Sequence, residues 1–366
     1  MRPINISAQE LAVFKKNARV RGLIGKEAWI AQDATVELEL WRAYRRKGLC
    51  LKVFHESQDT AALWGGVPLA ESAKAQNLFA MRGLAPRVYD IVTLGKGWGH
   101  VAQVTDYVEA SGKPDVALAA RIAAKFSITA KDLAKSEPSI GAYLARAPKW
   151  RGGKLVDFGR LYFADPDMIR ERLRKHVAIY HKKPHKGRNG YQPCEALGVP
   201  GFRDINYRQE RMGLTEVEVT GRTVLDLGCN NGAITRLADR LGAKRAVGVD
   251  HKFCMGNREL TSWLGQGNVD FVQARLPQDR KRIAKETGIK RFDVVFCLSV
   301  LGHAGGYAPW FPKLVAPGGT VFFEGQGRDK RENYQALLDR DFAEVEWLGW
   351  IEDHGVHPLW KCRKAG

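Results

Sequence analysis

The sequence lacks the features that would anchor it in a membrane or stabilise it with disulfides. No apolar run approaches the roughly 20 residues that a helix needs to cross a bilayer. The segment MRPINISAQELAVFKKNARV lacks the apolar core of a signal peptide. The six cysteines are far apart, with no C-x-x-C pair: Cys50, Cys194, Cys229, Cys254, Cys297 and Cys362. This cysteine usage indicates reduced thiols rather than a disulfide framework or a zinc site, so we expect a cytoplasmic protein without a bound metal.

The composition is that of a globular chain with an excess of positive charge. Hydrophobic residues make up 45% and charged residues 27%, which excludes a disordered or fibrous chain, and 366 residues suggest two domains. Lys+Arg number 58 against 40 Asp+Glu, a net charge of +18. Residues 1–200 hold 33 against 19, a balance of +14, and residues 201–366 hold 25 against 21, a balance of +4. We therefore expect any surface that faces a polyanion in the upstream half.

The densest basic stretch is residues 170–188, RERLRKHVAIYHKKPHKGR. It holds eight Lys/Arg and three His against one acid, Glu171. One interpretation is a solvated helix followed by a basic connector. The other is an arm that binds phosphate groups on a substrate, an RNA or a lipid headgroup, which would allow peripheral contact with a membrane.

The chain is expected to divide after this stretch. Three prolines and four glycines in residues 182–204 exclude a long helix or a central strand. We therefore expect a basic helix and linker at 166–203 between an upstream domain, 1–165, and a downstream domain, 204–366. Downstream, strands alternate with amphipathic helices, which predicts βαβ units and a mostly parallel sheet. The predicted strands are 223–227, 245–249, 269–272, 292–298, 320–324, 343–350 and 358–363, with a helix at 233–241 after the first.

The segment from Thr223 to Gly232, TVLDLGCNNG, carries the clearest chemistry. A buried strand ends in the acid Asp226 and enters a turn, where glycines let the backbone bend sharply and a ligand approach. Asp250, eighteen residues past Gly232, follows the next strand, where a carboxylate can accept both hydroxyls of a ribose. The loop is D-x-G-x-x-x-G rather than G-x-G-x-x-G, and an acid there disfavours a pyrophosphate. We therefore expect a nucleoside ligand that carries a cationic or amine group.

Here the chain resembles the class I S-adenosylmethionine-dependent methyltransferases, whose first motif is a strand ending in [VL]-L-D-[LIV]-G-C-G-x-G. Phe292–His303, FDVVFCLSVLGH, and Leu314–Phe323, LVAPGGTVFF, are similar to later motifs of that family. The resemblance covers residues 204–366 and implies S-adenosylmethionine as the cofactor. It also implies an α/β, Rossmann-like fold with helices on both faces of a mostly parallel sheet. A dinucleotide-binding domain is the alternative.

The resemblance further implies which residues contact the cofactor. Asp226 would lie near its amino group, Asp250 would hold the ribose hydroxyls, and His251 would line the adenosine side. Arg275 stands in the approximate place of the family's third-strand acid, so Gln273 or a backbone carbonyl would recognise the adenine. The expected cofactor-binding residues are Asp226, Gly228, Asn230, Gly232, Asp250, His251, Gln273, Ala274 and Leu298.

Methyl transfer asks little of side chains, because the sulfonium is already a strong electrophile and in-line positioning supplies most of the acceleration. His303 is the candidate general base, with a hydrogen-bonded loop histidine as the alternative. Tyr307 and Glu324 are secondary candidates for orienting an acceptor. No N/D-P-P-Y/F tetrapeptide follows the fourth strand, which argues against methylation of the exocyclic amino groups of nucleobases. Cys297 lies within that strand, which argues against covalent methylation of cytosine C5. An oxygen or nitrogen acceptor is left.

Residues 1–165 resemble the protein-kinase-like fold at three positions. Lys52 lies in an apolar strand, Glu71 in a helical stretch, and Asp157 in a D-F-G sequence; in such a site the lysine orients phosphates and the aspartate holds Mg²⁺. Residues 139–153 contain neither Asp nor Asn, so the H-R-D-x-x-x-x-N loop is missing. We expect a smaller, degenerate α+β kinase-like domain, with ATP/Mg²⁺ binding, an active kinase and chance similarity left open.

A further resemblance joins the halves. Bacterial enzymes that modify surface glycans combine a methyltransferase with a kinase-like module, and a similar approach to the cofactor motif occurs at Tyr191-Gln192, Pro200–Arg203 and Glu210-Arg211. The predicted function is methyl transfer from S-adenosylmethionine to a glycan, a sugar phosphate or another phosphorylated small molecule. Two alternatives stay open: an RNA methyltransferase that binds RNA through residues 170–188, and a cofactor-sensing adaptor without catalysis.

Overall fold

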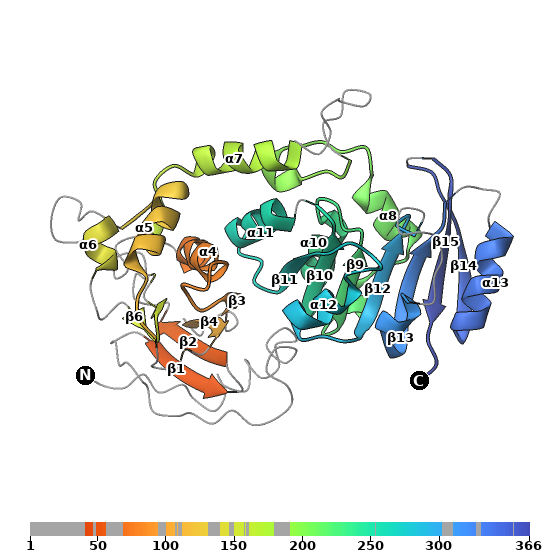
Figure 1. Cartoon of the computed structure of the whole chain (residues 1–366), viewed down its shortest axis with the longest axis horizontal. Helices are drawn as coiled ribbons and strands as arrows, with labels where there is room; N and C mark the ends of the chain where they lie inside the picture. Colours follow the sequence, from red (N-terminus) through yellow and green to blue (C-terminus); the bar gives the residue numbers. More distant parts are fainter. Residues whose placement is uncertain are drawn as a thin grey trace. The chain divides into compact units, whose positions relative to one another are not determined.

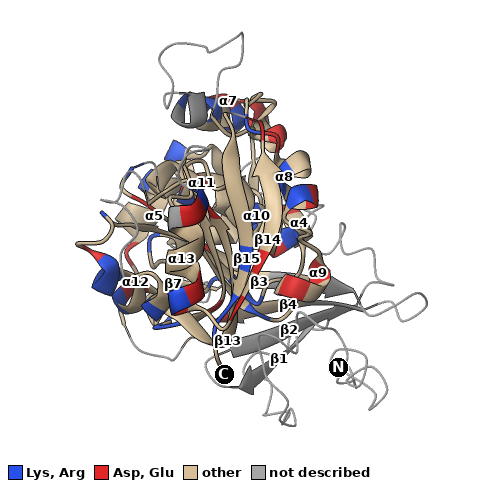
Figure 2. Cartoon of the chain, turned by 90° about the vertical axis from the view of Figure 1, so that its right-hand side faces the viewer, with Lys and Arg blue, Asp and Glu red and all other residues tan. Residues whose placement is uncertain are grey.

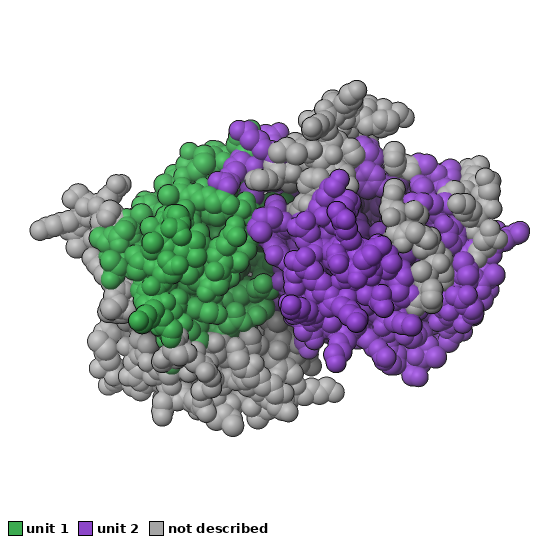
Figure 3. All heavy atoms as spheres, in the orientation of Figure 1, with its two compact units in different colours: residues 1–171, 259–267 green, residues 172–258, 268–366 purple. Residues whose placement is uncertain are grey.

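The chain forms two compact units. The first contains residues 1–171 and 259–267, and the second contains residues 172–258 and 268–366 (Figure 3). Each unit has its own β-sheet. The computed structural model describes residues 41–46, 49–55, 69–93, 100–106, 108, 112–130, 140–145, 150–156, 158, 161–178, 191–252, 254–301, 310–326, 331–353 and 355–366.

The first unit is built on a four-stranded antiparallel sheet with the order β1-β2-β4-β3. Helix α4 (Leu69–Ala80) connects β2 to β3 (Figure 1). Asn77 holds this helix to the sheet, because its side-chain amide accepts from the Val88 N–H at 2.8 Å and donates to the Val88 carbonyl at 3.1 Å. The strand around Lys52 and the helix around Glu71 are therefore both present as predicted. The strands are β1 (Trp41–Arg46), β2 (Leu49–His55), β3 (Val88–Thr93) and β4 (His100–Asp106).

Shorter elements follow the sheet of the first unit. Strand β5 pairs with β8 and β6 pairs with β7, both antiparallel. Phe79, Phe126 and Tyr143 are among its fully buried side chains. In α7, at the start of the basic stretch, Arg170 pairs with Asp167 at 2.6 Å while both side chains stay exposed. The elements are α5 (Val116–Lys125), β5 (Ile128–Ala130), α6 (Ile140–Leu144), β6 (Trp150–Arg151), β7 (Lys154–Leu155), β8 (Leu161–Phe163) and α7 (Pro166–Ala178).

The second unit contains a seven-stranded sheet with the order β11-β10-β9-β12-β13-β15-β14. All its pairings are parallel except those of β15, which runs antiparallel to both neighbours. The prediction of a mostly parallel sheet is confirmed, and the first and fourth predicted strands match to the residue. The strands are β9 (Thr223–Leu227), β10 (Arg245–Asp250), β11 (Val269–Gln273), β12 (Phe292–Leu298), β13 (Val315–Glu324), β14 (Glu344–Ile351) and β15 (His357–Arg363).

Helices cover both faces of this sheet, as the Rossmann-like prediction requires (Figure 1). Alternate residues of a strand point to opposite faces. Leu225 therefore belongs to one hydrophobic cluster, which includes Ile283 of α12 and Leu338 of α13, while Val224 belongs to another, which includes Leu237 of α10. None of the helices in the described ranges is long and apolar enough to cross a membrane. The helices are α8 (Ile205–Arg211), α9 (Glu216–Val219), α10 (Ala233–Arg240), α11 (Cys254–Trp263), α12 (Arg280–Thr287) and α13 (Arg331–Asp341), with short 3-10 turns at Glu195–Leu197 and Pro312–Leu314.

Strand β13 begins five residues before its predicted start, at Val315 instead of Thr320. Phe292 pairs with Val315 and Val294 with Thr320, so the Pro-Gly-Gly segment between them bulges out of the ladder. Gly319 allows this, because a Cβ at that position would lie 2.8 Å from the Ala316 carbonyl oxygen. The segment that looked like a turn before a strand is a bulge inside one.

Positive charge in the second unit gathers on α12 (Figure 2). Arg280, Lys281, Arg282 and Lys285 are exposed there, against the single acid Glu286 in the same helix. Arg282 and Glu286 form an exposed i,i+4 ion pair, an arrangement that contributes little to stability. The near-neutral balance of residues 201–366 therefore hides a local basic surface.

Candidate functional site

The candidate site lies at one edge of the seven-stranded sheet, where the strand order changes direction. From β9 the chain adds β10 and β11 on one side and then returns to place β12 and β13 on the other. In a parallel sheet such a reversal leaves a crevice outside the carboxyl ends of the two central strands. Asp226 lies in β9, Asp250 ends β10 and Leu298 ends β12. The topology thus gathers at one edge residues that are far apart in the sequence.

The loop between β9 and α10 depends on its two glycines. Gly228 and Gly232 have φ angles of +70° and +73°, in the left-handed region that favours glycine. A Cβ on Gly228 would lie 2.5 Å from Cγ2 of Val300, and one on Gly232 would lie 2.4 Å from the ring of Phe271. Asn230 between them also has a positive φ, +52°. Backbone angle and close packing therefore both exclude larger residues at the two glycines.

Asp250 ties this loop to the end of β10. The Asn230 N–H donates to its Oδ2 at 3.0 Å and the Lys252 N–H donates to its Oδ1 at 3.1 Å. The imidazole of His251, 51% exposed, has its Nδ1 3.0 Å from Oδ1. Each carboxylate oxygen has about two acceptor positions, so the backbone bonds leave capacity that a ligand hydroxyl can use. Asp250 therefore shapes the loop and can still accept hydrogen bonds.

Asp226 lies deeper, with only 3% of the residue exposed. Its Oδ2 accepts a hydrogen bond from the Thr235 hydroxyl at 2.7 Å. Burial raises the pKa of the Asp226 carboxyl to about 7 and the charge of Asp250 adds to this, while the Thr235 hydrogen bond and the charge of Arg236 oppose it. Near neutral pH this carboxyl therefore exists in both protonation states.

The other predicted cofactor residues lie along the same edge. Gln273 ends β11, is exposed, and its Nε2 donates to the His251 carbonyl at 3.1 Å. Ala274 is buried, and its N–H donates to the Asp250 carbonyl at 2.9 Å. Leu298 is half-buried at the end of β12. Gln273 and Ala274 therefore bond to the end of β10 and the residue that follows it, and Leu298 lies at the end of the neighbouring central strand.

The structure does not bring the other four predicted site residues together in its described parts. His303 and Asp157 lie outside the described residues, and Lys52 is described only by its position in β2. Glu71, in the first turn of α4, pairs with Lys74 at 2.6 Å on the surface of its own helix. The predicted pairing of Lys52 with Glu71 stays a prediction.

Two amide side chains that were not predicted as site residues hold the loop from outside. Oε1 of Gln192 accepts from the N–H of Ala233, the first residue of α10, at 3.0 Å. Nδ2 of Asn257 donates to the Asn230 carbonyl at 2.7 Å. Both satisfy backbone groups that a loop cannot satisfy itself. The only sequence signal was the Tyr191-Gln192 resemblance, which gave Gln192 no role.

Arg236 is a buried cation beside the same loop and was also missed. Its guanidinium lies over the ring of Phe271, 5.7 Å from the centroid, and its Nη2 donates to the Asn231 carbonyl. Its Nη1 has no hydrogen-bond partner among the described residues. Burial lowers the pKa of this guanidinium. The Nη1 atom is itself buried, and an unsatisfied buried N–H group costs stability.

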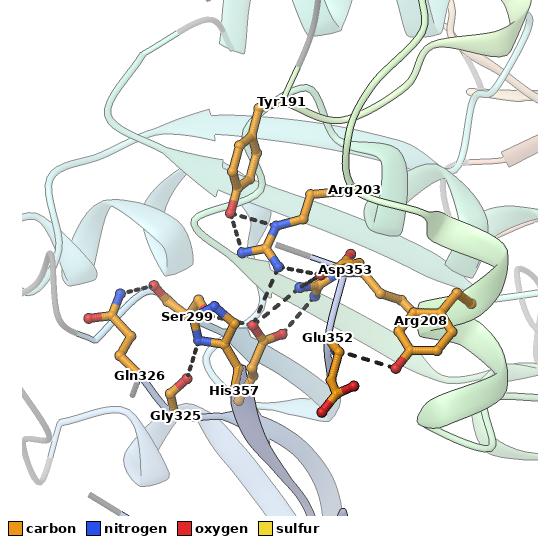
Figure 4. Close-up of polar contacts among 11 residues, drawn as sticks. Tyr191, Arg203, Arg208, Ser299, Gly325, Gln326, Glu352, Asp353 and His357 are labelled. Atoms are coloured by element: carbon orange, nitrogen blue, oxygen red, sulfur yellow. Dashed lines mark hydrogen bonds and ion pairs between the residues drawn. The ribbon is translucent and has the colours of Figure 1, made fainter. Parts of the chain in front are cut away.

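A second polar cluster lies at the carboxyl ends of β12 and β13 (Figure 4). We call Arg203, Arg208, Glu324 and Asp353 the buried ion network; each side chain is at most 5% exposed. Arg208 binds Glu324 through Nη1 at 2.7 Å and Asp353 through Nε at 2.7 Å. Arg203 binds Asp353 through Nη1 at 2.6 Å and donates from Nε to the Tyr191 hydroxyl at 2.8 Å. Of the four, only Glu324 was named from the sequence as a candidate side chain.

The charges of the buried ion network hold one another ionised. Burial by itself would lower the pKa of the Arg208 guanidinium, but the charges and hydrogen bonds of Glu324 and Asp353 outweigh it and raise that pKa. Burial would raise the pKa of the Asp353 carboxyl, but Arg208 and Arg203 hold it below its usual value. Losing one partner of such a cluster typically costs about 3–5 kcal/mol, because an uncompensated buried charge is left.

Comparison with known proteins places this edge in a recognised domain. Residues 202–361 match a family model described as a methyltransferase domain. The chain is 33% identical over 144 residues to the ribosomal protein L11 methyltransferase of Pseudomonas paraeruginosa, covering 38% of this chain and 46% of that protein. It is 30% identical over 146 residues to the ubiquinone biosynthesis O-methyltransferase of Paraburkholderia xenovorans, covering 38% and 57%. The chain thus spans about half the length of the curated relatives it matches. A solved ribosomal protein L11 methylase from Lactobacillus delbrueckii subsp. bulgaricus shares 16% identity, with a TM-score of 0.34 over 43% of this chain and 77% of that one.

We expect Asp226→Asn to remove a pH dependence of stability. The folded-state pKa of about 7 lies above the ordinary 3.8, so protonation favours the folded state. This contribution is complete below about pH 4 and is lost as the pH rises through about 7. Between about pH 5 and about pH 8 the free energy of unfolding, measured in urea, should fall by a few kcal/mol more in the wild type than in the variant. The exposed Asp279→Asn should keep the wild-type slope; equal slopes in wild type and Asp226→Asn would contradict the assignment.

Proposed function

We propose that the chain transfers a methyl group from S-adenosylmethionine to an oxygen or nitrogen acceptor, because residues 202–361 match a family model described as a methyltransferase domain. The observation that carries the proposal is the shared edge of β9, β10 and β12, where the glycine loop and Asp250 meet. S-adenosylmethionine supplies an electrophilic methyl group when bound. The task of the chain is then to hold the cofactor and the acceptor in line, which is where most of the acceleration arises.

The donors and acceptors at this edge fit the parts of that cofactor. Asp250 is proposed to accept hydrogen bonds from the ribose hydroxyls through the positions that the Asn230 and Lys252 N–H groups leave. Asp226 is proposed to act near the amino group, although its Oδ2 already accepts from Thr235. The remaining proposed contacts are Gly228, Asn230, Gly232, His251, Gln273, Ala274 and Leu298.

For the acceptor, we propose a glycan, a sugar phosphate or another phosphorylated small molecule. The support is the polar wall at the carboxyl ends of β12 and β13 and the resemblance of the Tyr191–Arg203 segment to glycan-modifying enzymes. The two curated relatives are named for a ribosomal protein and for ubiquinone biosynthesis, so they do not select an acceptor here. A general base at His303, RNA binding through residues 170–188 and a cytoplasmic location stay predictions.

Binding of S-adenosylhomocysteine tests the central proposal. We expect Asp250→Ala to weaken its affinity by at least about tenfold, because hydrogen bonds to a charged group contribute about 1.5–3 kcal/mol each. Asp250→Asn keeps one acceptor oxygen and should weaken the affinity less. The measurement is isothermal titration calorimetry at neutral pH.

The matched control is Glu344→Ala, which removes an exposed carboxylate on β14 and should leave the affinity unchanged. Thermal unfolding of each variant separates lost binding from a collapsed loop, since Asp250 also bonds the Asn230 N–H. No binding to the wild type, or equal binding to Asp250→Ala, would contradict the proposal.

A nucleotide site in the first unit is a separate proposal. It is supported by the position of Lys52 in β2, of Glu71 in the first turn of α4, and by the connection of the two strands through that helix. If the site works, ATP with Mg²⁺ should raise the melting temperature of the wild type but not of Lys52→Ala. Lys113→Ala, at an exposed position of the same unit, should respond as the wild type does. Equal responses of wild type and Lys52→Ala would reject the site.

A further inference from the structure

The wall at the carboxyl ends of β12 and β13 lies next to the cofactor loop within the second unit. Ser299 follows β12 directly, and the side chain of its neighbour Val300 packs against Gly228. Gln326 follows β13 by two residues. An acceptor that meets the methyl group at the crevice therefore approaches Ser299 and Gln326. The polar groups of these two residues limit the chemical class of the acceptor.

Ser299 is held in an unusual backbone conformation. Its φ is +55°, in the left-handed region that non-glycine residues rarely adopt and that often marks functional sites. Its N–H donates to the Glu324 carbonyl at 3.1 Å, and its hydroxyl donates to the Glu324 carboxylate. Glu324 is in turn held by Arg208. The Ser299 carbonyl is therefore set in place by the buried ion network.

The side-chain amide of Gln326 donates a hydrogen bond to this carbonyl, which fixes its orientation (Figure 4). Its Nε2 donates to the Ser299 carbonyl oxygen at 2.9 Å. Because a carbonyl oxygen can only accept, the amide nitrogen must face Ser299. The amide oxygen then points away from the network, as the close-up shows, and no partner for it is found within the described ranges. Gln326 is half-buried and presents one oriented hydrogen-bond acceptor.

The charges of the buried ion network beside Gln326 are already balanced. Two arginines face two carboxylates in the buried ion network, and all six guanidinium nitrogens have partners. A phosphate or carboxylate placed here would meet no unpaired cation of the described wall and would lie near Glu324 and Asp353. Moving an anion from water to such a place is costly. An uncharged group with a hydrogen-bond donor meets no such penalty and satisfies the free oxygen of Gln326.

We propose that the methyl acceptor is an uncharged, hydroxyl-bearing molecule, one of whose hydroxyl groups donates to Oε1 of Gln326. The inference rests on the proposed methyl transfer and narrows its acceptor class to neutral polyhydroxyl compounds, without the phosphorylated ones. Gln326 is a specificity residue: it selects a donor group and positions the acceptor, and it takes no part in breaking or forming bonds.

The test uses the full chain with methyl-labelled S-adenosylmethionine and a metabolite and glycan extract of the cells that produce the protein. The extract is passed at neutral pH over a cation exchanger and then an anion exchanger, which gives an unretained, uncharged fraction and an acidic fraction retained on the anion exchanger. Labelled product is expected from the unretained fraction only. Product from the retained fraction alone would overturn the inference while leaving the proposed methyl transfer intact.

Variants of Gln326 give the second readout. Gln326→Met keeps the length of the side chain without the acceptor oxygen, and it should lower kcat/KM for the unretained acceptor by about tenfold, mainly through KM. Its affinity for S-adenosylhomocysteine should stay within about twofold of the wild type. Gln278→Met, at an exposed position before α12, is the matched control and should behave as the wild type.

Unchanged kcat/KM in Gln326→Met would overturn the role of Gln326. A failure of the proposed function looks different: neither fraction yields product and S-adenosylhomocysteine does not bind the wild type. If the cofactor product binds but no fraction is methylated, both the methyl transfer and the acceptor class are rejected.

Discussion

The parallel pairing of β9 with β10 on one side and with β12 on the other is the constraint on which the candidate site depends. It places the ends of three strands at one edge and leaves a crevice between the two central ones. The turn that follows β9 must then be tight, and Gly228 and Gly232 allow this because neither their backbone angles nor their neighbours tolerate a Cβ. Asp250 completes the arrangement by bonding the Asn230 N–H across the loop.

The buried ion network extends this constraint to the acceptor side. Charges are taken out of water only where the partners and hydrogen bonds compensate one another, and here two arginines and two carboxylates do so with very little exposure. The network spans three separate parts of the sequence: the segment around Arg203 and Arg208, the end of β13 at Glu324, and the β14–β15 connection at Asp353. As a result, the wall is charge-balanced, and its hydrogen bonds hold Ser299 and, through the Ser299 carbonyl, Gln326.

Much of the second unit could be predicted, because its signals are local. The alternation of apolar segments with amphipathic helices identified each strand of the sheet, and the bounds of β9 and β12 match the prediction to the residue. Gly228, Asn230 and Gly232 lie in the loop between β9 and α10, and their contact with the cofactor stays a prediction. Prediction failed where a local pattern has two outcomes: the Pro-Gly-Gly segment before Thr320 looked like a turn, yet the pairing of β12 with β13 continues across it as a bulge. Gln192, Arg236 and Asn257 were missed because their partners are backbone groups or rings distant in the sequence.

The sequence by itself determined the strand pattern, the glycine loop and the acid at the end of the second strand, since these follow from short-range periodicity and from the conformational freedom of glycine. Only the tertiary structure decided what the polar residues around them face. It buried Asp226 against Thr235 and raised the pKa of its carboxyl, and it left one nitrogen of Arg236 without a hydrogen-bond partner among the described residues. It also joined Arg203 and Arg208 to Glu324 and Asp353. Burial and charge pairing depend on which distant segments pack together, and the order of residues along the chain does not state this.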